Sequence, residues 1–175
     1  MFTPIKNKVF QRLFQSKKYA QNRHRKTLQW KEIKSIGFLL DGSDPIQLRL
    51  LLNKLYGYKS EGKKIEMIGY VKKLPPFEEE NIKWITKKDL SWAGIPKMNA
   101  IKDFIEKDFD ILINTSLDSI RPLEFISAFS NSKLRIGVFS ENKTYCYDFM
   151  MHIDSHTDTF NYLDQVEHYL KLLNH

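Results

Sequence analysis

Hydroxyl and carboxylate side chains cluster in two short stretches that each follow an apolar run. The first is Asp41-Gly42-Ser43-Asp44, and the second is Asn114-Thr115-Ser116-Leu117-Asp118. Ligands of open parallel sheets bind beyond the carboxyl ends of the strands, so these loops would form one site if the preceding strands are neighbours. The predicted small-ligand residues are Asp41, Ser43, Thr115, Ser116, Asp118 and Arg121. The same residue types also form ordinary caps and turns, so a purely structural interpretation stays open.

Neither loop carries a complete catalytic or cofactor-binding motif. An aspartate ending a first strand resembles the nucleophile of phosphoryl-transfer folds, but those sites need a second acid two residues on or a distant lysine and acid cluster for magnesium. Ser43 stands at the second position. Neither standard glycine-rich phosphate loop is present. We therefore predict no cofactor and no catalytic residue, and we lean towards a protein that is not an enzyme.

A second group of polar residues combines imidazole and carboxylate. His152, Asp154, His156 and Asp158 lie within seven residues of one another, and such side chains can share a metal. A strand end running into a helix cap produces the same pattern, and we predict no metal here. Cys146 is the single cysteine, which excludes an internal disulfide and a paired-cysteine zinc site.

Positive charge is concentrated in the first 31 residues. This segment contains nine Lys or Arg and no Asp or Glu, leaving 19 of the 28 basic residues and all 21 acidic residues in the rest of the chain. The net charge of +7 therefore originates in the segment, which predicts a polyanionic partner. The predicted nucleic-acid-binding residues are Lys6, Lys8, Arg12, Lys17, Lys18, Arg23, Arg25 and Lys26.

Apolar residues in this segment recur at helical spacing and predict an amphipathic helix over about residues 4–19. The favoured partner is structured RNA, with ribosomal RNA as the expected case and Phe10, Phe14, Tyr19 and Trp30 available to stack on exposed bases. The alternative is an anionic membrane surface that receives the apolar side of the same helix. A third hypothesis is a nucleotide or nucleotide-sugar binding domain, or an enzyme, that uses the strand-end loops.

The elements that must position these residues alternate between strands and helices. Strands are predicted over residues 35–41, 64–71, 82–85, 109–114, 134–139 and 148–153, and helices over residues 44–56, 97–107, 121–128 and 158–173. Alternation predicts a doubly wound, mostly parallel Rossmann-like sheet of five or six strands, with the basic helix as an N-terminal extension. We assign residues 1–31 to a basic arm and residues 32–175 to a single α/β domain.

Two helices carry more detailed predictions. Gly57 is expected to end the first one, whose predicted buried face is Ile46, Leu48, Leu51, Leu52 and Leu55. The closing helix is expected to bury Phe160, Leu163, Val166, Tyr169, Leu170 and Leu173.

No apolar run approaches the ~20 residues that span a bilayer, and no secretory signal is recognisable at the N-terminus. We therefore expect a cytoplasmic protein without a transmembrane segment. The oligomeric state is not predicted.

Five stretches together resemble a known group of proteins. They are residues 34–41 (KSIGFLLD), 109–114 (FDILIN), 121–123 (RPL), 134–137 (LRIG) and 147–151 (YDFMM). With the basic first helix, they resemble a family of small uncharacterised α/β proteins from Bacteroidota over nearly the full chain. The run from Asp110 to Met151 is more loosely similar to the donor-binding half of heptosyltransferase-type glycosyltransferases, without an intact donor-binding motif. The resemblance implies the fold and supplies no activity.

Overall fold

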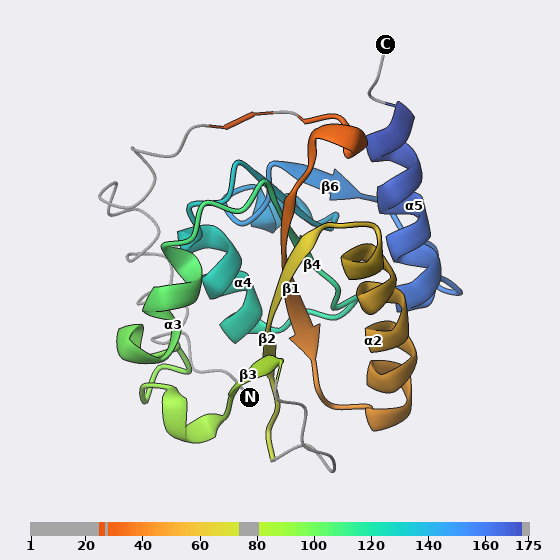
Figure 1. The fold of residues 1–175 in the computed structure, drawn as a ribbon. Helices are drawn as coiled ribbons and strands as arrows, with labels where there is room; N and C mark the ends of the chain where they lie inside the picture. The colour runs from red at the N-terminus through yellow and green to blue at the C-terminus, as the bar shows by residue number, and fades with distance from the viewer. Residues whose placement is uncertain (1–24, 27, 74–80, 173–175) are drawn as a thin grey trace.

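A six-stranded parallel sheet forms the centre of the protein (Figure 1). The computed structural model describes residues 25–26, 28–73 and 81–172. The strand order is β3-β2-β1-β4-β5-β6, and all five neighbouring pairs run parallel. The strands are β1 (Ser35–Asp41), β2 (Lys64–Tyr70), β3 (Ile82–Ile85), β4 (Ile111–Asn114), β5 (Leu134–Val138) and β6 (Phe149–Met151). The chain winds outward from β1 to β3 on one side and from β4 to β6 on the other.

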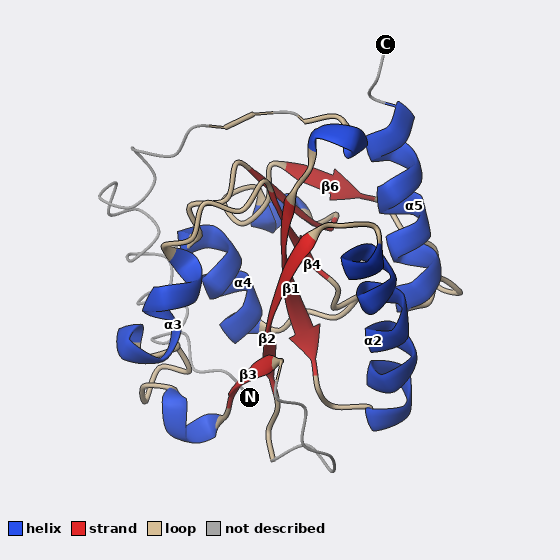
Figure 2. Cartoon of the chain, in the orientation of Figure 1, coloured by secondary structure: helices blue, strands red, loops and turns tan. Residues whose placement is uncertain are grey.

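Helices cover both faces of the sheet (Figure 2). The helices α2 (Pro45–Ser60) and α5 (Thr159–Leu172) lie on one face, and α3 (Met98–Ile105) and α4 (Arg121–Phe129) lie on the other. Short 3-10 helices complete the elements: η1 (Trp30–Glu32), η2 (Lys87–Asp89) and η3 (Glu141–Lys143). This arrangement confirms the predicted doubly wound α/β fold. The helix predicted over residues 4–19 lies outside the described residues.

The sheet separates two apolar cores, which explains why β1 is apolar throughout. Ile36, Phe38 and Leu40 enter the core beneath α2 and α5, whereas Leu39 enters the core beneath α3 and α4. Successive side chains of a strand point to opposite faces, so a strand covered on both sides needs apolar residues at every position. All four of these side chains are fully buried.

The helix α2 differs from its prediction at both ends. It continues through Gly57 to Ser60, and the left-handed residue that follows its end is Gly62, with φ +84°. The extra turn buries Tyr58, whose ring stacks on Phe38 and whose hydroxyl donates to Glu167 of α5. Tertiary packing therefore overrides the stop signal at Gly57. At the other end Ile46 is 74% exposed, so its predicted burial is wrong.

The buried face of α5 agrees with the prediction in part. Tyr162, Leu163, Val166 and Leu170 are buried, which confirms three predicted positions and adds Tyr162. Phe160 and Tyr169 are about half exposed, so their predicted burial is wrong, and Leu173 lies outside the described residues. The Phe160 ring instead lies 4.4 Å from the Lys54 ammonium, which gives this aromatic side chain a surface role.

The segment before β1 packs into the core. Leu28, Trp30 and Ile33 belong to the core beneath α2 and α5, although the sequence assigns the first two to the arm. The buried ammonium of Lys63 donates to the carbonyls of Trp30 and Ile33 at 3.0 and 2.9 Å, and burial lowers the pKa of this lysine. Trp30 also contacts Tyr58 edge-on, so its proposed stacking on bases is wrong. No helix among the described residues is long and apolar enough to cross a membrane.

Candidate functional site

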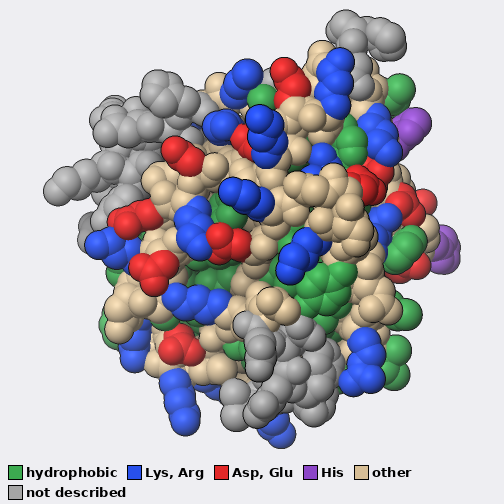
Figure 3. Space-filling view, in the orientation of Figure 1, with side chains coloured by type: hydrophobic (Ala, Val, Ile, Leu, Met, Phe, Trp, Pro, Cys, Tyr) green, Lys and Arg blue, Asp and Glu red, His purple; other side chains and the backbone are tan. Residues whose placement is uncertain are grey.

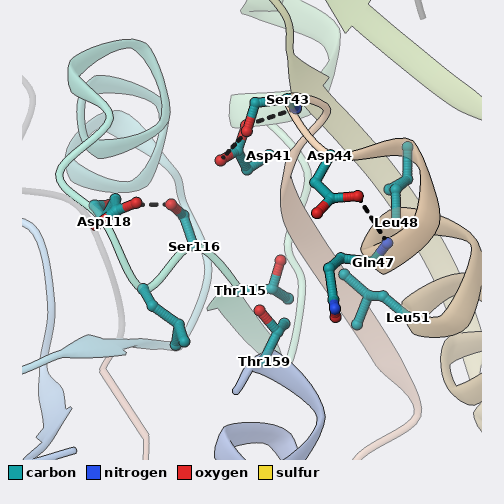
Figure 4. Close-up of a pocket in the computed structure, with 11 residues that line it drawn as sticks. Asp41, Ser43, Asp44, Gln47, Leu48, Leu51, Thr115, Ser116, Asp118 and Thr159 are labelled. Carbon is teal, nitrogen blue, oxygen red and sulfur yellow. Dashed lines mark hydrogen bonds between the residues drawn. The ribbon is translucent and has the colours of Figure 1, made fainter. Parts of the chain in front are cut away.

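A pocket of about 220 Å³ opens where β1 and β4 end side by side (Figure 4). These two strands are the point at which the strand order reverses, because β1 leads outward to β2 and β4 leads outward to β5. Such a reversal is the usual ligand position in open parallel sheets. The pocket is lined by Asp41, Ser43, Asp44, Gln47, Leu48, Leu51, Thr115, Ser116, Leu117, Asp118 and Thr159.

Hydrogen bonds hold the ends of β1 and β4 together behind the pocket. The backbone amide of Thr115 donates to the Leu39 carbonyl at 3.0 Å, and the Thr115 hydroxyl donates to the same oxygen at 2.8 Å. Thr115 is buried, so this doubled contact fixes the position of its side chain at the base of the pocket.

The loop after β1 is shaped by a close aromatic contact. Asp41 accepts hydrogen bonds from the backbone amide and the hydroxyl of Ser43, at 2.9 and 2.8 Å. The Trp84 ring lies so close to Gly42 that a Cβ atom there would stand 2.6 Å from it. A glycine is therefore required for Trp84 to reach this loop, and the ring supports the backbone that carries Asp41 and Ser43.

The loop after β4 forms the facing wall. The side-chain amide of Asn114 donates to the Tyr147 hydroxyl at 2.7 Å, and its oxygen accepts from the Ser116 amide at 3.1 Å. The Ser116 hydroxyl donates to the Asp118 carbonyl at 3.0 Å. These bonds turn the chain so that Ser116 and Asp118 lie opposite Asp41 and Ser43 (Figure 4).

The first turn of α2 and the start of α5 complete the pocket. Asp44 caps α2 by accepting from the amides of Ile46 and Gln47. Asp158 accepts from the Asn161 amide at the start of α5, beside Thr159. Sequence reasoning missed Gln47 and Thr159. Gln47 was detectable one turn after the Asp44 cap, whereas the position of Thr159 depends on how α5 crosses back over the sheet.

The structure brings together five of the six residues predicted for a small-ligand site: Asp41, Ser43, Thr115, Ser116 and Asp118. Arg121, the first residue of α4, is not among the residues that line this pocket. Whether a ligand occupies the pocket stays a prediction.

The group of His152, Asp154, His156 and Asp158, at which no metal is predicted, contains a turn and a helix cap. Asp154 accepts from the His156 amide and from the Thr157 hydroxyl, each at 2.9 Å, and Asp158 caps α5. His152 stacks on Phe139 with ring centroids 3.9 Å apart. Within the part of the chain that the structure describes, no group of three or more ligating side chains could hold a metal ion.

Cys146 is not placed for nucleophilic chemistry. The residue is fully buried, and burial, with the nearby charge of Glu124, raises the pKa of its thiol well above the ordinary value. A reactive thiol needs a lowered pKa and access to substrate, so this cysteine belongs to the core.

Lys and Arg side chains are spread over the visible face of the protein (Figure 3), and one group of them lies at the opposite end of the strands, where each strand begins. We define the basic edge as Arg25, Lys26, Lys31, Lys34, Lys64 and Lys133. Backbone hydrogen bonds place its members in pairs, from Lys64 to the Lys34 carbonyl at 2.7 Å and from Lys26 to the Lys133 carbonyl at 3.3 Å. Of the predicted nucleic-acid-binding residues, Arg25 and Lys26 are described and exposed. The others, Lys6, Lys8, Arg12, Lys17, Lys18 and Arg23, lie outside the described residues.

Two carboxylates beneath the basic edge orient part of it. Asp110 accepts from the Lys133 ammonium at 2.7 Å and from the amides of Lys34 and Ser35 at 2.8 and 3.0 Å. Asp148 lies 3.4 Å from the guanidinium of Arg25, whose side chain is 70% exposed. Both acids are largely buried while the cations reach solvent, so the outward charge of these pairs is positive.

Comparison with known proteins places the chain in a family without assigning an activity. No curated protein and no solved structure matches it. One family model matches residues 6–173, which covers nearly the whole chain, including most of the basic segment. The chain therefore belongs to DUF6913, a family of unknown function.

Proposed function

We propose that this protein binds structured RNA through its basic N-terminal segment and the basic edge, with ribosomal RNA in the cytoplasm as the expected partner. The observation that supports the proposal is that the basic N-terminal segment continues directly into the basic edge of the domain. The segment with nine basic and no acidic residues enters the described structure at Arg25 and Lys26, and the basic edge begins there.

The geometry of the basic edge suits a linear polyphosphate. Lys64 and Lys34 stand at the starts of the neighbouring strands β2 and β1, and Lys133 stands at the start of β5, beyond β4; neighbouring strands lie about 4.8 Å apart. The backbone of the sheet thus spaces these cations along a line. Fixed cations along a phosphate chain release counterions on binding, which predicts affinity that falls steeply with salt.

An anionic membrane surface is the competing partner. Membrane binding by this segment would depend on its apolar residues, whereas the feature shared with the domain is charge alone. No carboxylate among the described residues forms an ion pair with Lys26, Lys31, Lys34 or Lys64. The part of the contact surface that the structure describes therefore offers charge, and RNA binding depends on charge where membrane binding would also need the apolar residues. The resemblances to Bacteroidota proteins and to glycosyltransferase donor domains stay predictions and support no part of this proposal.

The test measures binding of the full-length protein to a fluorescent RNA hairpin across a salt series, beside co-sedimentation with phosphatidylglycerol vesicles. We compare the wild type with the triple variant Arg23→Glu, Arg25→Glu, Lys26→Glu. The matched control reverses three exposed lysines near the far ends of β2 and β3: Lys72→Glu, Lys73→Glu and Lys87→Glu. Both triple variants change the net charge equally, so a difference between them reports position.

We expect the Arg23, Arg25 and Lys26 variant to lose RNA binding and the control to keep most of it. If any binding remains in the first variant, the negative slope of log affinity against log salt should become less steep by about 2–3, because three phosphate contacts are lost. Circular dichroism checks that both variants fold. Equal RNA binding by wild type and the first variant would contradict the proposal, as would vesicle binding without RNA binding.

A further inference from the structure

We propose that the pocket between β1 and β4 binds a neutral polyhydroxylated ligand of monosaccharide size, such as a free sugar or the ribose of a nucleoside. The inference does not rest on RNA binding, because the pocket lies at the strand ends opposite the basic edge. Its starting point is a cavity at the strand-order reversal with an apolar side and a polar side.

The polar side of the pocket accepts hydrogen bonds. The hydroxyls of Ser43, Thr115 and Ser116 all donate to oxygens of the protein: to Asp41, to the Leu39 carbonyl and to the Asp118 carbonyl. A hydroxyl whose hydrogen already donates to a protein oxygen offers only its lone pairs to a ligand. With the Asp41 and Asp118 carboxylates, these groups make a surface rich in acceptors, to which Gln47 and Thr159 add side chains that can also donate. The hydroxyl groups of a polyol both donate and accept, so they suit such a lining.

The pocket is unsuited to phosphate and carboxylate groups. Asp41, Asp44 and Asp118 contribute three acidic side chains, and the described lining contains no lysine or arginine. Helix N-termini often bind anions through free amides, but Asp44 already accepts from the Ile46 and Gln47 amides at the start of α2. An anion would therefore meet like charge from three carboxylates, and the amides at the start of α2 that could bind it are already occupied. This argues against the phosphate groups of a nucleotide or nucleotide-sugar in the pocket itself.

The remaining lining is apolar and limits the ligand's size. Leu48 and Leu51 line the pocket beside the polar groups (Figure 4), and Leu117 completes the apolar lining. Sugars carry an apolar C–H face and a rim of hydroxyl donors, so they match a pocket with both kinds of surface. The volume of about 220 Å³ lies below the ~300–1,000 Å³ of ordinary ligand pockets, which restricts the ligand to about one ring.

The experiment uses saturation-transfer NMR on the full-length protein with D-ribose, D-glucose and adenosine as probes. Putrescine and inorganic phosphate serve as cationic and anionic comparisons. The test variant is Asp118→Ala, because Asp118 is exposed and its truncation spares the loop's backbone contacts. The control is Asp108→Asn, which removes one acidic charge from an exposed residue at the other end of the strands.

We expect at least one polyol probe to bind the wild type and the Asp108→Asn variant with similar affinity. Loss of a hydrogen bond to a charged group should weaken its binding to Asp118→Ala by about tenfold or more. Three results would overturn the proposal: no polyol binds, a polyol binds Asp118→Ala as it binds the wild type, or only putrescine or phosphate binds.

Discussion

Replacement of Asp110 by asparagine tests whether one buried carboxylate joins three strands at their starts. Asp110 precedes β4, accepts from the backbone amides of Lys34 and Ser35 at the start of β1, and accepts from Lys133 beside β5. It is 8% exposed. Asparagine keeps the size of the side chain and can keep accepting from the two amides, but it carries no charge.

The cost follows from the bonds that change. A hydrogen bond to a charged partner contributes about 1.5–3 kcal/mol, against about 1 kcal/mol for a neutral one. The bond to the Lys133 ammonium is lost and the two amide bonds become neutral. The Lys133 side chain is 36% exposed, so solvent screens its bond and the low end applies. We expect a loss of about 2 kcal/mol from the free energy of unfolding, which is a large share of the ~5–15 kcal/mol of a typical domain.

The effect should depend on pH in a defined direction. Burial by itself raises the pKa of Asp110, but hydrogen bonds from Lys133 and from the amides of Lys34 and Ser35 outweigh it and lower this pKa below its ordinary value of 3.8. A carboxyl group whose pKa is lower in the folded state stabilises the fold above its unfolded pKa. The stabilisation is therefore complete above about pH 4 and is lost as the pH falls through the folded pKa.

Urea denaturation of wild type, Asp110→Asn and Asp108→Asn at pH 7 and at stepwise lower pH measures the effect. At pH 7 we expect the midpoint of Asp110→Asn to fall by about 1 M, and that of Asp108→Asn to change little. The difference between wild type and Asp110→Asn should shrink below about pH 4. Equal effects of the two substitutions at pH 7, or a difference that persists undiminished at low pH, would refute the reasoning.

Two further substitutions test the packing around the site and beneath α5. Gly69→Ala would place a Cβ atom 2.3 Å from the Trp84 ring and should lower the free energy of unfolding by about 1–3 kcal/mol, whereas the same change in a Trp84→Leu background should cost much less; equal costs in urea denaturation would contradict the contact. Tyr162→Phe should leave stability unchanged or raise it by up to about 1 kcal/mol, because the buried Tyr162 hydroxyl has no described hydrogen-bond partner, and a clear loss in the same assay would show that the hydroxyl is satisfied.

Much of the fold was predictable because parallel strands covered on both faces have a strong pattern. Residues 35–41 were predicted from an uninterrupted apolar run ending in turn residues, and β1 spans the same residues. The Asp44-Pro45 pair likewise marks the start of α2. Both signals are local in the sequence, so they need no knowledge of the tertiary structure.

The wrong predictions concern residues whose position depends on contacts with distant parts of the chain. Gly57 does not end α2, because Tyr58 beyond it gains a buried contact with Trp30 and a hydrogen bond to Glu167, 109 residues away along the chain. Trp30 follows a strongly basic segment and was assigned to that segment from the sequence. It belongs instead to the core, where the Lys63 ammonium donates to its carbonyl. The sequence near Gly57 and near Trp30 contains no pattern that predicts these distant partners.

In the candidate site too, local features were predictable and contributions from distant elements were not. The polar residues at the ends of β1 and β4 could be identified from the sequence. Their closeness in space was predicted on the assumption that the two strands are neighbours. The contribution of Thr159 was not readable, because it requires the position of α5 across the sheet. Arg121 was included for its closeness in sequence to Asp118, and the first turn of α4 carries it away from the pocket lining.

The central position of β1 has a consequence for synthesis of the chain. One edge of β1 pairs with β2, which is complete at Tyr70, but the other edge pairs with β4, which is complete only at Asn114. At about 5–20 residues per second, the ribosome takes seconds to add the residues between them. During that time an apolar strand without charge from Ser35 to Leu40 keeps an open edge, a state prone to pairing with other nascent chains. Slower expression, which lowers the concentration of nascent chains, is therefore expected to raise the yield of folded protein.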